Sequence, residues 1–557
     1  MPREHQLLAV YVIKSVNKIS AARLVYRDGD ASTGDFPLST AETFIPGKAI
    51  EILAGTENDP ISLFTGIVIR QGLKVRDNSA PQLLVECRHQ AVKLTVGRKS
   101  AYYFEQTDSD IIQTLLENAG IEADVESTSV THKQQVQYDS TDWDFLLTRA
   151  EANGKLIFTN TATVTVKAPV FEGTPVCALQ FGATLLELDA EIDARLQYSA
   201  VKSFTWDAAQ QSVVEKEAAD PGVSGPGNLR GDDLAAVVGL DHYPLQTAAL
   251  TEEEAQAWAD AQWLKSKMSK VSGRGKCEGI ATINPGDIVT LSGVGERYNG
   301  DVLVTGVRQD FNLVQGWKTH IQFGSTAQWL AAVNRDVSAP KAAALLPGVT
   351  GLQIGVVVSN EDPDGEHRVR VRMPLVNEAE DGTWARVAVL DAGDQRGFFF
   401  RPEVGDEVVL GFLNDDPRQA VLLGMLHSSA KSAPLQGSDD NHEKLYQSRS
   451  KLKLYFHDDK KLMQFETPAG NQITLSEQDK AIRIVDQNGN KIELTPAGIK
   501  IESSKMLELK AGTDVKLASG TSLSITGGTE LKLEGTAGTE LSSTAITKVK
   551  GALVQIN

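Results

Sequence analysis

The sequence predicts a mostly β, multidomain protein made of a mixed α/β domain, a small five-stranded barrel and a C-terminal β-prism that three chains share. Three observations predict this fold. Helix signals stop before residue 340, five short strands follow between residues 351 and 427, and an eight-residue apolar repeat begins at residue 499. A chain of 557 residues has room for three to four domains of about 150 residues each.

The composition is that of an acidic globular protein, with 55 Lys and Arg against 73 Asp and Glu and a net charge of −18. Nucleic acid and anionic membrane surfaces need a cationic face, so neither is expected as the main partner. Cys87, Cys177 and Cys277 are odd in number and form no CxxC pair, which predicts reduced thiols rather than a disulfide framework or a zinc site. No signal-peptide pattern opens the chain and no apolar run approaches the roughly 20 residues that span a bilayer, so we expect folding in the cytoplasm and exit by a route other than general secretion.

The first domain, residues 1–345, is expected to combine strands with a few helices. Helices are predicted at residues 107–120, 139–154 and 251–270, where apolar side chains recur at helical spacing. In the third helix Thr251 and Glu254 form a capping box, with acids in the first turn and lysines in the last, as the helix dipole favours. Two prolines and several small residues make residues 337–351 a predicted linker.

The second domain, residues 346–428, carries five short strand-like runs bounded by Asp, Pro or Gly. The runs are "IGVVVS", "HRVRVRM", "TWARVAVL", "GDEVVLGF" and "AVLLGML". Five strands in this length suit a closed barrel of the oligonucleotide/oligosaccharide-binding (OB) type. Such barrels often bind nucleic acid, but residues 351–427 carry 14 acidic and 7 basic side chains, so we expect no nucleic acid here. The polar residues 429–450 form a second predicted linker.

The last domain, residues 451–557, contains the eight-residue repeat. One apolar position recurs seven times from residue 501 to residue 549, and the position two residues earlier is apolar from residue 499 to residue 531. Residues two apart on a strand point to the same face, so each repeat should send two aliphatic side chains inward. The predicted core of this needle consists of Ile499, Ile501, Leu507, Leu509, Val515, Leu517, Leu523, Ile525, Leu531, Leu533, Leu541 and Val549.

The length of the repeat favours three chains over one. Eight residues of strand span only about 26 Å, too short a contour for one chain to close a solenoid turn, whereas three chains with one face each would close a triangular prism. The alternative is an antiparallel meander of a single chain. A two-residue turn at Ser519 and Gly520 would, however, place Leu523 on the opposite face from Leu517, and a meander would leave its apolar face uncovered. We therefore favour an intertwined trimeric β-helix, which has no long free edge.

The order of these domains and several motifs resemble the VgrG spike protein of type VI secretion and its relatives in phage tails and phage-tail-like contractile particles. In the barrel, "TWARVAVLDAG" and "FFFRPEVGDEVVLGFLNDDPRQAVLLGML" fit the family's signature closely. "QYDSTDWDFLLTRAEANG" (137–154) and "INPGDIVTLSGVGERYNGDVLVTGVRQDF" (283–311) resemble its tail-hub domain, and "TPAGNQITLSE" (467–477) resembles the entry to its needle. The resemblance covers nearly the whole chain.

The resemblance implies a homotrimeric spike at the tip of a contractile injection machine. The hub domain would cap the inner tube among baseplate proteins, and the needle would pierce the target envelope on sheath contraction, with only transient mechanical contact with a membrane. It also implies synthesis in the bacterial cytoplasm and delivery with the particle, outside the cell or into the target. Some relatives carry a lysozyme domain before the needle or an effector domain after it, but here a short linker precedes the needle and the sequence ends at Asn557. Effectors are therefore expected to travel as separate cargo, and the motifs do not decide between a type VI system and a free particle of the Photorhabdus virulence cassette kind.

The last ten residues, "KVKGALVQIN", keep Leu553, Val554 and Ile556 in an apolar alternation. A β-prism that stops leaves unpaired strand groups and an apolar blunt end, which need a cap. In the resembled family a PAAR-repeat tip protein binds this surface, so we expect the tip-docking site at these three residues. A frayed terminus is the alternative.

We expect no catalytic, cofactor-binding or metal-binding residues. The Gly-rich segments 222–231 and 271–279 lack the GxxxxGK[ST] spacing of a phosphate-binding loop and are predicted to be plain loops. The histidines form no HxH or HExxH pair. Asp139, Asp142 and Asp144 are interpreted as charges at a helix N-terminus rather than as an acid/base pair.

Two other classes of function stay open. A tail-associated cell-wall hydrolase or a polysaccharide lyase would be an enzyme, although eight residues are too few for the coil of a single-chain lyase. A trimeric glycan-binding tail fibre would carry a globular receptor head, whereas here the needle ends the sequence. A mechanical spike without enzyme activity is the function that the sequence favours.

Overall fold

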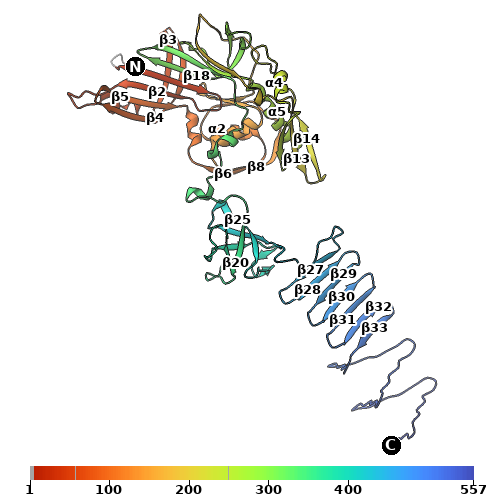
Figure 1. The fold of residues 1–557 in the computed structure, drawn as a ribbon. Coiled ribbons are helices and arrows are strands. Elements are labelled where there is room, and N and C mark those ends of the chain that lie inside the picture. The colour runs from red at the N-terminus through yellow and green to blue at the C-terminus, as the bar shows by residue number, and fades with distance from the viewer. Residues whose placement is uncertain (1–4, 57, 249, 557) are drawn as a thin grey trace.

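A computed structural model describes residues 5–56, 58–248 and 250–556 and arranges them as three successive units (Figure 1). The N-terminal domain is the largest. The barrel lies between it and a C-terminal sheet, and the last residues extend away from that sheet. The molecule is therefore elongated, with its two termini at opposite ends.

An 11-stranded sheet forms the body of the N-terminal domain, and all neighbours along its main path are antiparallel. In sheet order the strands are β12 (Leu185–Ile192), β16 (Val271–Glu278), β19 (Gly316–Phe323), β18 (Gly300–Asn312), β1 (Leu7–Ser15), β2 (Ala21–Arg27), β5 (Ser79–Arg88), β4 (Asp59–Arg76) and β3 (Ala49–Thr56). Strand β17 (Ile288–Ser292) also pairs with β18, and β11 (Cys177–Gln180) joins β17 in parallel. Two separate apolar clusters, one around Tyr26 and Phe64 and one around Phe323, bury the inner faces of these strands.

Strand β16 corrects one prediction, because residues 271–279 were expected to be a plain loop. The segment instead pairs with both β12 and β19. Its glycines permit this close approach: a Cβ on Gly273 would lie 2.4 Å from the carbonyl oxygen of Asp189 and 2.6 Å from the ring of Phe323. Glycine serves strand packing here, which is one of its known uses inside sheets.

The three predicted helices are confirmed. They are α2 (Asp108–Asn118), α3 (Asp142–Ala152) and α5 (Glu252–Met268). At the start of α5 the Thr251 hydroxyl accepts a hydrogen bond from the Glu254 amide (3.3 Å), and the Glu254 carboxylate accepts one from the Thr251 amide (2.9 Å). Helices α2 and α3 share a core that includes the fully buried Ile112 and Leu146. The shorter helices are α1 (Pro37–Thr40), α4 (Gly231–Val238) and α6 (Leu330–Val333), and the 3-10 turns are η1 (Glu42–Phe44), η2 (Gln90–Thr95), η3 (Ala194–Leu196), η4 (Arg335–Val337), η5 (Lys341–Ala344) and η6 (Leu413–Asp415).

Three small sheets complete the N-terminal domain. They consist of β7 (Ala123–Val125), β10 (Val164–Lys167) and β9 (Leu156–Phe158); of β14 (Ser212–Glu217), β13 (Val201–Asp207) and β15 (Tyr243–Thr247); and of β6 (Lys99–Thr107) with β8 (Thr131–Ser140). The β6–β8 ribbon lies on the side of the domain that faces the barrel (Figure 1).

The predicted barrel is confirmed and lies within residues 346–428. It closes in the order β20 (Gln353–Ser359), β21 (Val369–Arg372), β22 (Thr383–Val387), β26 (Ala420–Met425) and β25 (Glu407–Phe412). Alternate residues of each strand point inward and are fully buried, as the short apolar alternation predicts. Between β22 and β25 a small hairpin, β23 (Ala392–Gly393) and β24 (Arg396–Gly397), projects from the barrel.

Residues 443–502 form a seven-stranded antiparallel sheet in which every strand pairs with its neighbour in sequence. The strands are β27 (Glu443–Gln447), β28 (Lys453–His457), β29 (Leu462–Glu466), β30 (Gln472–Ser476), β31 (Ala481–Val485), β32 (Lys491–Thr495) and β33 (Gly498–Glu502). Within one chain, residues 443–502 therefore form a meander, and the trimeric needle over residues 451–557 stays a prediction. Strand β27 also lies inside the predicted linker 429–450.

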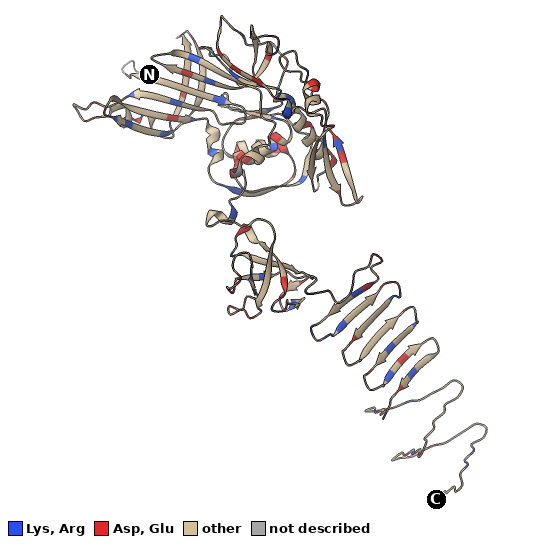
Figure 2. Cartoon of the chain, in the orientation of Figure 1, with Lys and Arg blue, Asp and Glu red and all other residues tan. Residues whose placement is uncertain are grey.

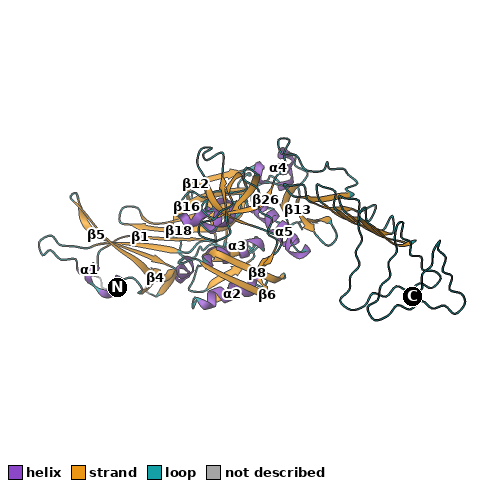
Figure 3. Ribbon diagram, turned by 90° about the horizontal axis from the view of Figure 1, so that it is seen from below, coloured by secondary structure: helices purple, strands orange, loops and turns teal. Residues whose placement is uncertain are grey.

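The repeat itself behaves differently from this sheet. Residues 503–556 carry no strand, and they continue from β33 as extended loops (Figures 1 and 3). Across the described residues, no helix combines the length and the apolar character needed to cross a bilayer.

Candidate functional site

The C-terminal sheet has one apolar face, which two rows of side chains build across its strands. Cross-strand pairing places the members of each row directly opposite one another. The first row consists of Tyr446, Leu454, Phe465, Ile473, Ile484, Ile492 and Ile501. The second row consists of Phe456, Met463, Leu475, Ile482, Leu494 and Ile499.

This apolar face is open in the single chain. Phe465 is 47% exposed, Ile484 42% and Ile499 72%. Soluble monomers rarely expose a contiguous apolar surface of this extent, and such surfaces usually mark a contact with another molecule. We therefore take the face as the candidate functional site.

The opposite face of the same sheet is polar and carries ion pairs. Lys453 lies 3.4 Å from Glu466, and Lys491 lies 2.9 Å from Glu502. Hydrogen bonds from Lys500 and Lys491 lower the pKa of Glu502 below its ordinary value, which keeps that carboxylate charged. Figure 2 shows both signs of charge along these strands. A sheet with one charged and one apolar face directs the charged face to water.

Two of the predicted needle-core residues complete the two rows. Ile499 and Ile501 lie on β33 at the end of the sheet. The other ten lie on the loops of residues 503–556, with exposed fractions between 53% and 73%. The single chain therefore does not bring these ten side chains together. The predicted tip residues are also exposed, at 77% for Leu553, 48% for Val554 and 91% for Ile556.

Sequence reasoning missed the part of the apolar face between residues 446 and 494. The search used a fixed period of eight, whereas the inward pairs from Leu454 to Ile492 are spaced alternately by nine and ten residues. Alternating loops of four and five residues cause this spacing. A search for apolar pairs two residues apart, without a fixed period, would have found them.

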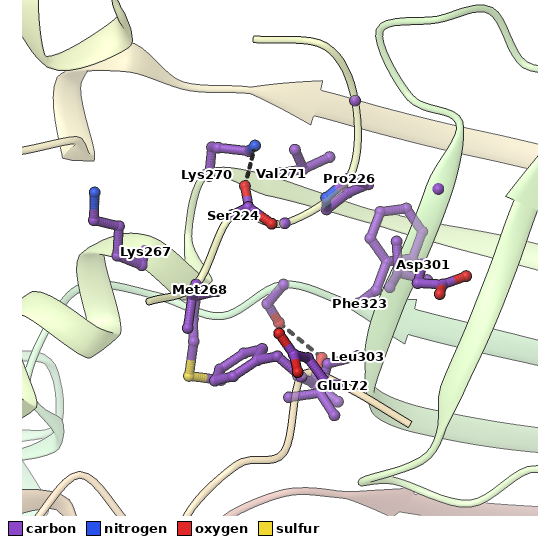
Figure 4. A pocket seen from close by; sticks show the side chains of 18 of the residues that line it. Glu172, Ser224, Pro226, Lys267, Met268, Lys270, Val271, Asp301, Leu303 and Phe323 are labelled. Atoms are coloured by element: carbon purple, nitrogen blue, oxygen red, sulfur yellow. Dashed lines mark hydrogen bonds between the residues drawn. The ribbon is translucent and has the colours of Figure 1, made fainter. Parts of the chain in front are cut away.

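The Gly-rich segment 222–231 borders a pocket in the N-terminal domain (Figure 4). Lys270, beside it, is buried and donates hydrogen bonds to the carbonyl oxygens of Ser224 and Leu229. Burial lowers the pKa of this lysine. Lys267, also at the pocket, has its ammonium 3.8 Å from Asp232. Both cations are thus engaged by the protein, and we interpret the segment as a structural loop.

A buried charge cluster joins three helices and was also missed from the sequence. The His132 ring lies between two carboxylates, 3.1 Å from Asp108 and 2.9 Å from Glu254. Arg149 of α3 forms a two-pronged contact with Asp108, at 2.6 and 2.9 Å, and Asn153 adds a third hydrogen bond. The cluster ties β8 to the N-termini of α2 and α5, so we assign it to fold stability. Within the described ranges, no group of three His, Cys, Asp or Glu side chains is arranged to hold a metal ion.

Of the three aspartates interpreted as helix charges, two lie on a helix and one lies on a strand. Asp142 and Asp144 lie in the first turn of α3, where the Asp142 carboxylate accepts a hydrogen bond from Gln137 (3.0 Å) and that of Asp144 one from the Thr141 hydroxyl (2.6 Å). Asp139 lies on β8 instead, in a left-handed backbone conformation with φ 38°. The interpretation therefore holds for two of the three, and Asp139 is a correction.

Two protein-family models match the sequence. Residues 1–312 match the family described as the Alg8 N-terminal domain. Residues 353–427 match the type VI secretion system/phage-baseplate injector OB domain, which coincides with the closed barrel.

Curated relatives are similar over parts of the chain. The type VI secretion system spike protein VgrG1b of Pseudomonas aeruginosa is 28% identical over 226 residues, or 38% of this chain and 29% of that protein. The actin cross-linking toxin VgrG1 of Vibrio cholerae is 33% identical over 96 residues, or 16% of this chain and 9% of that protein. The chain thus spans less than a third of either relative.

Among solved structures, a type VI secretion component of E. coli, described as similar to T4 bacteriophage tail proteins, is 12% identical with a TM-score of 0.39. The match covers 76% of this chain and 98% of that one.

Proposed function

The chain belongs to the family of the Alg8 N-terminal domain and is a VgrG-like spike protein, and we propose that it acts as the homotrimeric spike of a contractile injection machine. The hub would be the N-terminal domain, residues 1–345, followed by the barrel and a needle that begins with the C-terminal sheet.

One observation carries the proposal: two exposed apolar rows cross the C-terminal sheet, and the sequence beyond it repeats the same apolar pairs. Three copies of the sheet, each with its apolar face inward and its charged face outward, would bury both rows along a common axis. Each fully buried Ile, Leu or Phe contributes about 1.5–3 kcal/mol, so even a few layers outweigh the entropy that association costs. The loops of residues 503–556 would then supply the rows beyond β33 in all three copies.

The other partners follow from the same role. The hub would meet the inner tube and the baseplate proteins, and Leu553, Val554 and Ile556 would dock a PAAR-repeat tip protein. Sheath contraction would drive the needle through the target envelope and deliver effector cargo. The spike would be made in the bacterial cytoplasm and reach its target with the particle.

We propose a mechanical rather than an enzymatic role. The site consists of aliphatic and aromatic side chains, which supply neither a nucleophile nor a general base. One curated relative is named a toxin, but the stretch aligned with it covers only 9% of that protein. Release of soluble fragments from peptidoglycan by the purified chain would contradict this part of the proposal.

The test of the assembly is its mass in solution. Light scattering of the full chain should give about three times 60.1 kDa, and the value should persist on dilution. A mass of one chain would overturn the proposed trimer.

The tip site has its own test. Deletion of residues 551–557 should abolish co-purification of a tagged PAAR-repeat protein while the mass of the spike stays that of three chains. Retention of the tip protein by the shortened spike would show that docking lies elsewhere.

A further inference from the structure

A hairpin of the barrel exposes large apolar side chains beside the C-terminal sheet. This aromatic hairpin, residues 389–400, contains β23 and β24 and the run Phe398, Phe399 and Phe400. Leu390 is 90% exposed and Phe399 74%, while the other two rings are about half exposed. The barrel core is complete without them, so they contribute nothing to closing the barrel.

The aromatic hairpin has a defined shape. Asp391 pairs with Arg396 across it (2.6 Å), and the Phe398 amide donates to the Asp391 carbonyl (2.9 Å). The Arg401 guanidinium lies over the Phe399 ring at 5.6 Å and donates to the His367 carbonyl (3.0 Å). A side chain held in this way loses little further freedom on binding, which favours its use as a docking surface.

The aromatic hairpin is continuous with the apolar face of the C-terminal sheet. The Phe400 ring meets the Tyr446 ring edge to face, with centroids 4.9 Å apart, and Tyr446 begins the first apolar row. An ion pair between Arg449 and Glu403 (2.9 Å) is a second link between the barrel and the sheet. The apolar surface thus extends past the first strand of the sheet onto the barrel.

Symmetry indicates what covers this extension. In a prism of three identical chains, each inward layer meets the same layer of the other two copies. The ring of Phe400 packs on Tyr446, and the ring of Phe398 lies 5.8 Å from that of Phe400, so the layer of Tyr446 extends onto the hairpin. We infer that the aromatic hairpin docks against a second copy of this chain and closes the barrel end of the prism. This inference rests on the proposed trimer and adds a contact outside the needle.

The test introduces one additional cysteine at either of two positions in the full-length spike, which keeps Cys87, Cys177 and Cys277. Leu390→Cys lies on the aromatic hairpin. Leu375→Cys is the control because it is similarly exposed in the single chain but lies outside the hairpin, on the loop between β21 and β22. Labelling by a maleimide should be at least about tenfold slower in the native protein than in urea at Leu390→Cys, and equally fast in both at Leu375→Cys. The unsubstituted chain, measured in the native state and in urea, gives the background of Cys87, Cys177 and Cys277, which is subtracted from each rate. In the native protein, burial raises the pKa of the Cys87 and Cys277 thiols to about 12 and also raises that of the Cys177 thiol, which slows their labelling.

Phe399→Cys repeats the measurement at a second hairpin position, in case one substitution disturbs the loop. Fast native labelling at both hairpin positions, in a protein with the mass of three chains, would overturn the docking of the aromatic hairpin and leave the proposed function standing. A mass of one chain would overturn the proposed function itself.

Discussion

The barrel and the C-terminal sheet are built from the same kind of short alternating strand, yet only the barrel buries a core of its own. Its five strands close on themselves, and its eight core residues are at most 2% exposed. The C-terminal sheet stays open, and Ile484 near its centre is 42% exposed. Alternation therefore determines which side chains share a face, whereas closure determines whether one chain is enough to bury that face.

The largest effect is expected from a charge on the open face. Ile484→Asp would place a carboxylate in an apolar layer of each copy, where burial without a partner is costly. The three-chain species should disappear in light scattering, while the barrel and hub stay folded.

Val485→Asp is the matched control, since Val485 is the next residue of β31 and points to the charged face beside Lys491. Its mass should stay that of three chains. Equal masses for the two variants would refute the assignment of the interface to the apolar face.

The N-terminal domain, like the core of the barrel, is stabilised by contacts within one chain, and Asp108→Asn tests this. Burial alone would raise the pKa of Asp108, but hydrogen bonds and charge from Arg149 lower it below the ordinary value. Because the folded pKa is lowered, Asp108 stabilises the fold above the ordinary carboxyl pKa of about 3.9, and this stabilisation is lost as the pH falls through the folded pKa.

Removing one partner of a buried pair costs about 3–5 kcal/mol, so the urea midpoint of Asp108→Asn should drop strongly at pH 7. Its stability should also fall less steeply with acid than that of the native chain. Asp124→Asn, at an exposed position of β7, is the control and should behave as the native chain. An unchanged midpoint for Asp108→Asn would contradict the structural role of the cluster.

A smaller effect is expected inside the barrel. Leu422→Ala removes a fully buried side chain and should lower the free energy of unfolding by about 2–5 kcal/mol, whereas Leu423→Ala, at a half-exposed neighbour, should cost less than about 1 kcal/mol. Equal losses of stability for the two variants would contradict the burial of this core within one chain.

The smallest effect belongs to the charged face. Glu466→Gln removes a partly exposed pair with Lys453 and should change stability by less than about 1 kcal/mol, with a still smaller effect in high salt. Phe465→Asn, the adjacent residue on the apolar face, should lower the thermal midpoint far more. Similar midpoints for the two variants would mean that the two faces contribute equally.

Local signals made the helices and the barrel predictable. Capping residues fixed the start of α5 at Thr251, and short alternating runs were enough to identify the barrel. The start of α3 was placed three residues early because β8 runs on to Ser140, where pairing with Lys99 holds the chain extended. The sequence near Ser140 does not indicate this pairing, because its partner Lys99 lies about forty residues earlier in the chain.

The remaining features depend on contacts between distant segments. The glycines of residues 271–279 indicate a loop in the sequence. In the structure this segment is a strand, because Gly273 lets the Asp189 carbonyl and the Phe323 ring approach closely. His132 is an ordinary histidine in the sequence, and only the meeting of three helices places it between two carboxylates. The apolar pairs of β28–β32 follow no single period, because the loops between these strands alternate between four and five residues.

The pairing of each strand in β27–β33 with its neighbour in sequence also bears on how the spike is made. Contacts so close along the chain form quickly, in microseconds for a single hairpin, so each sheet can fold before another copy is met. Assembly then becomes the docking of preformed sheets, a step whose rate depends on concentration. Residues 503–556 pair with no neighbouring strand in the single chain, so they would order after the sheets have docked, starting at β33 and proceeding toward the C-terminus.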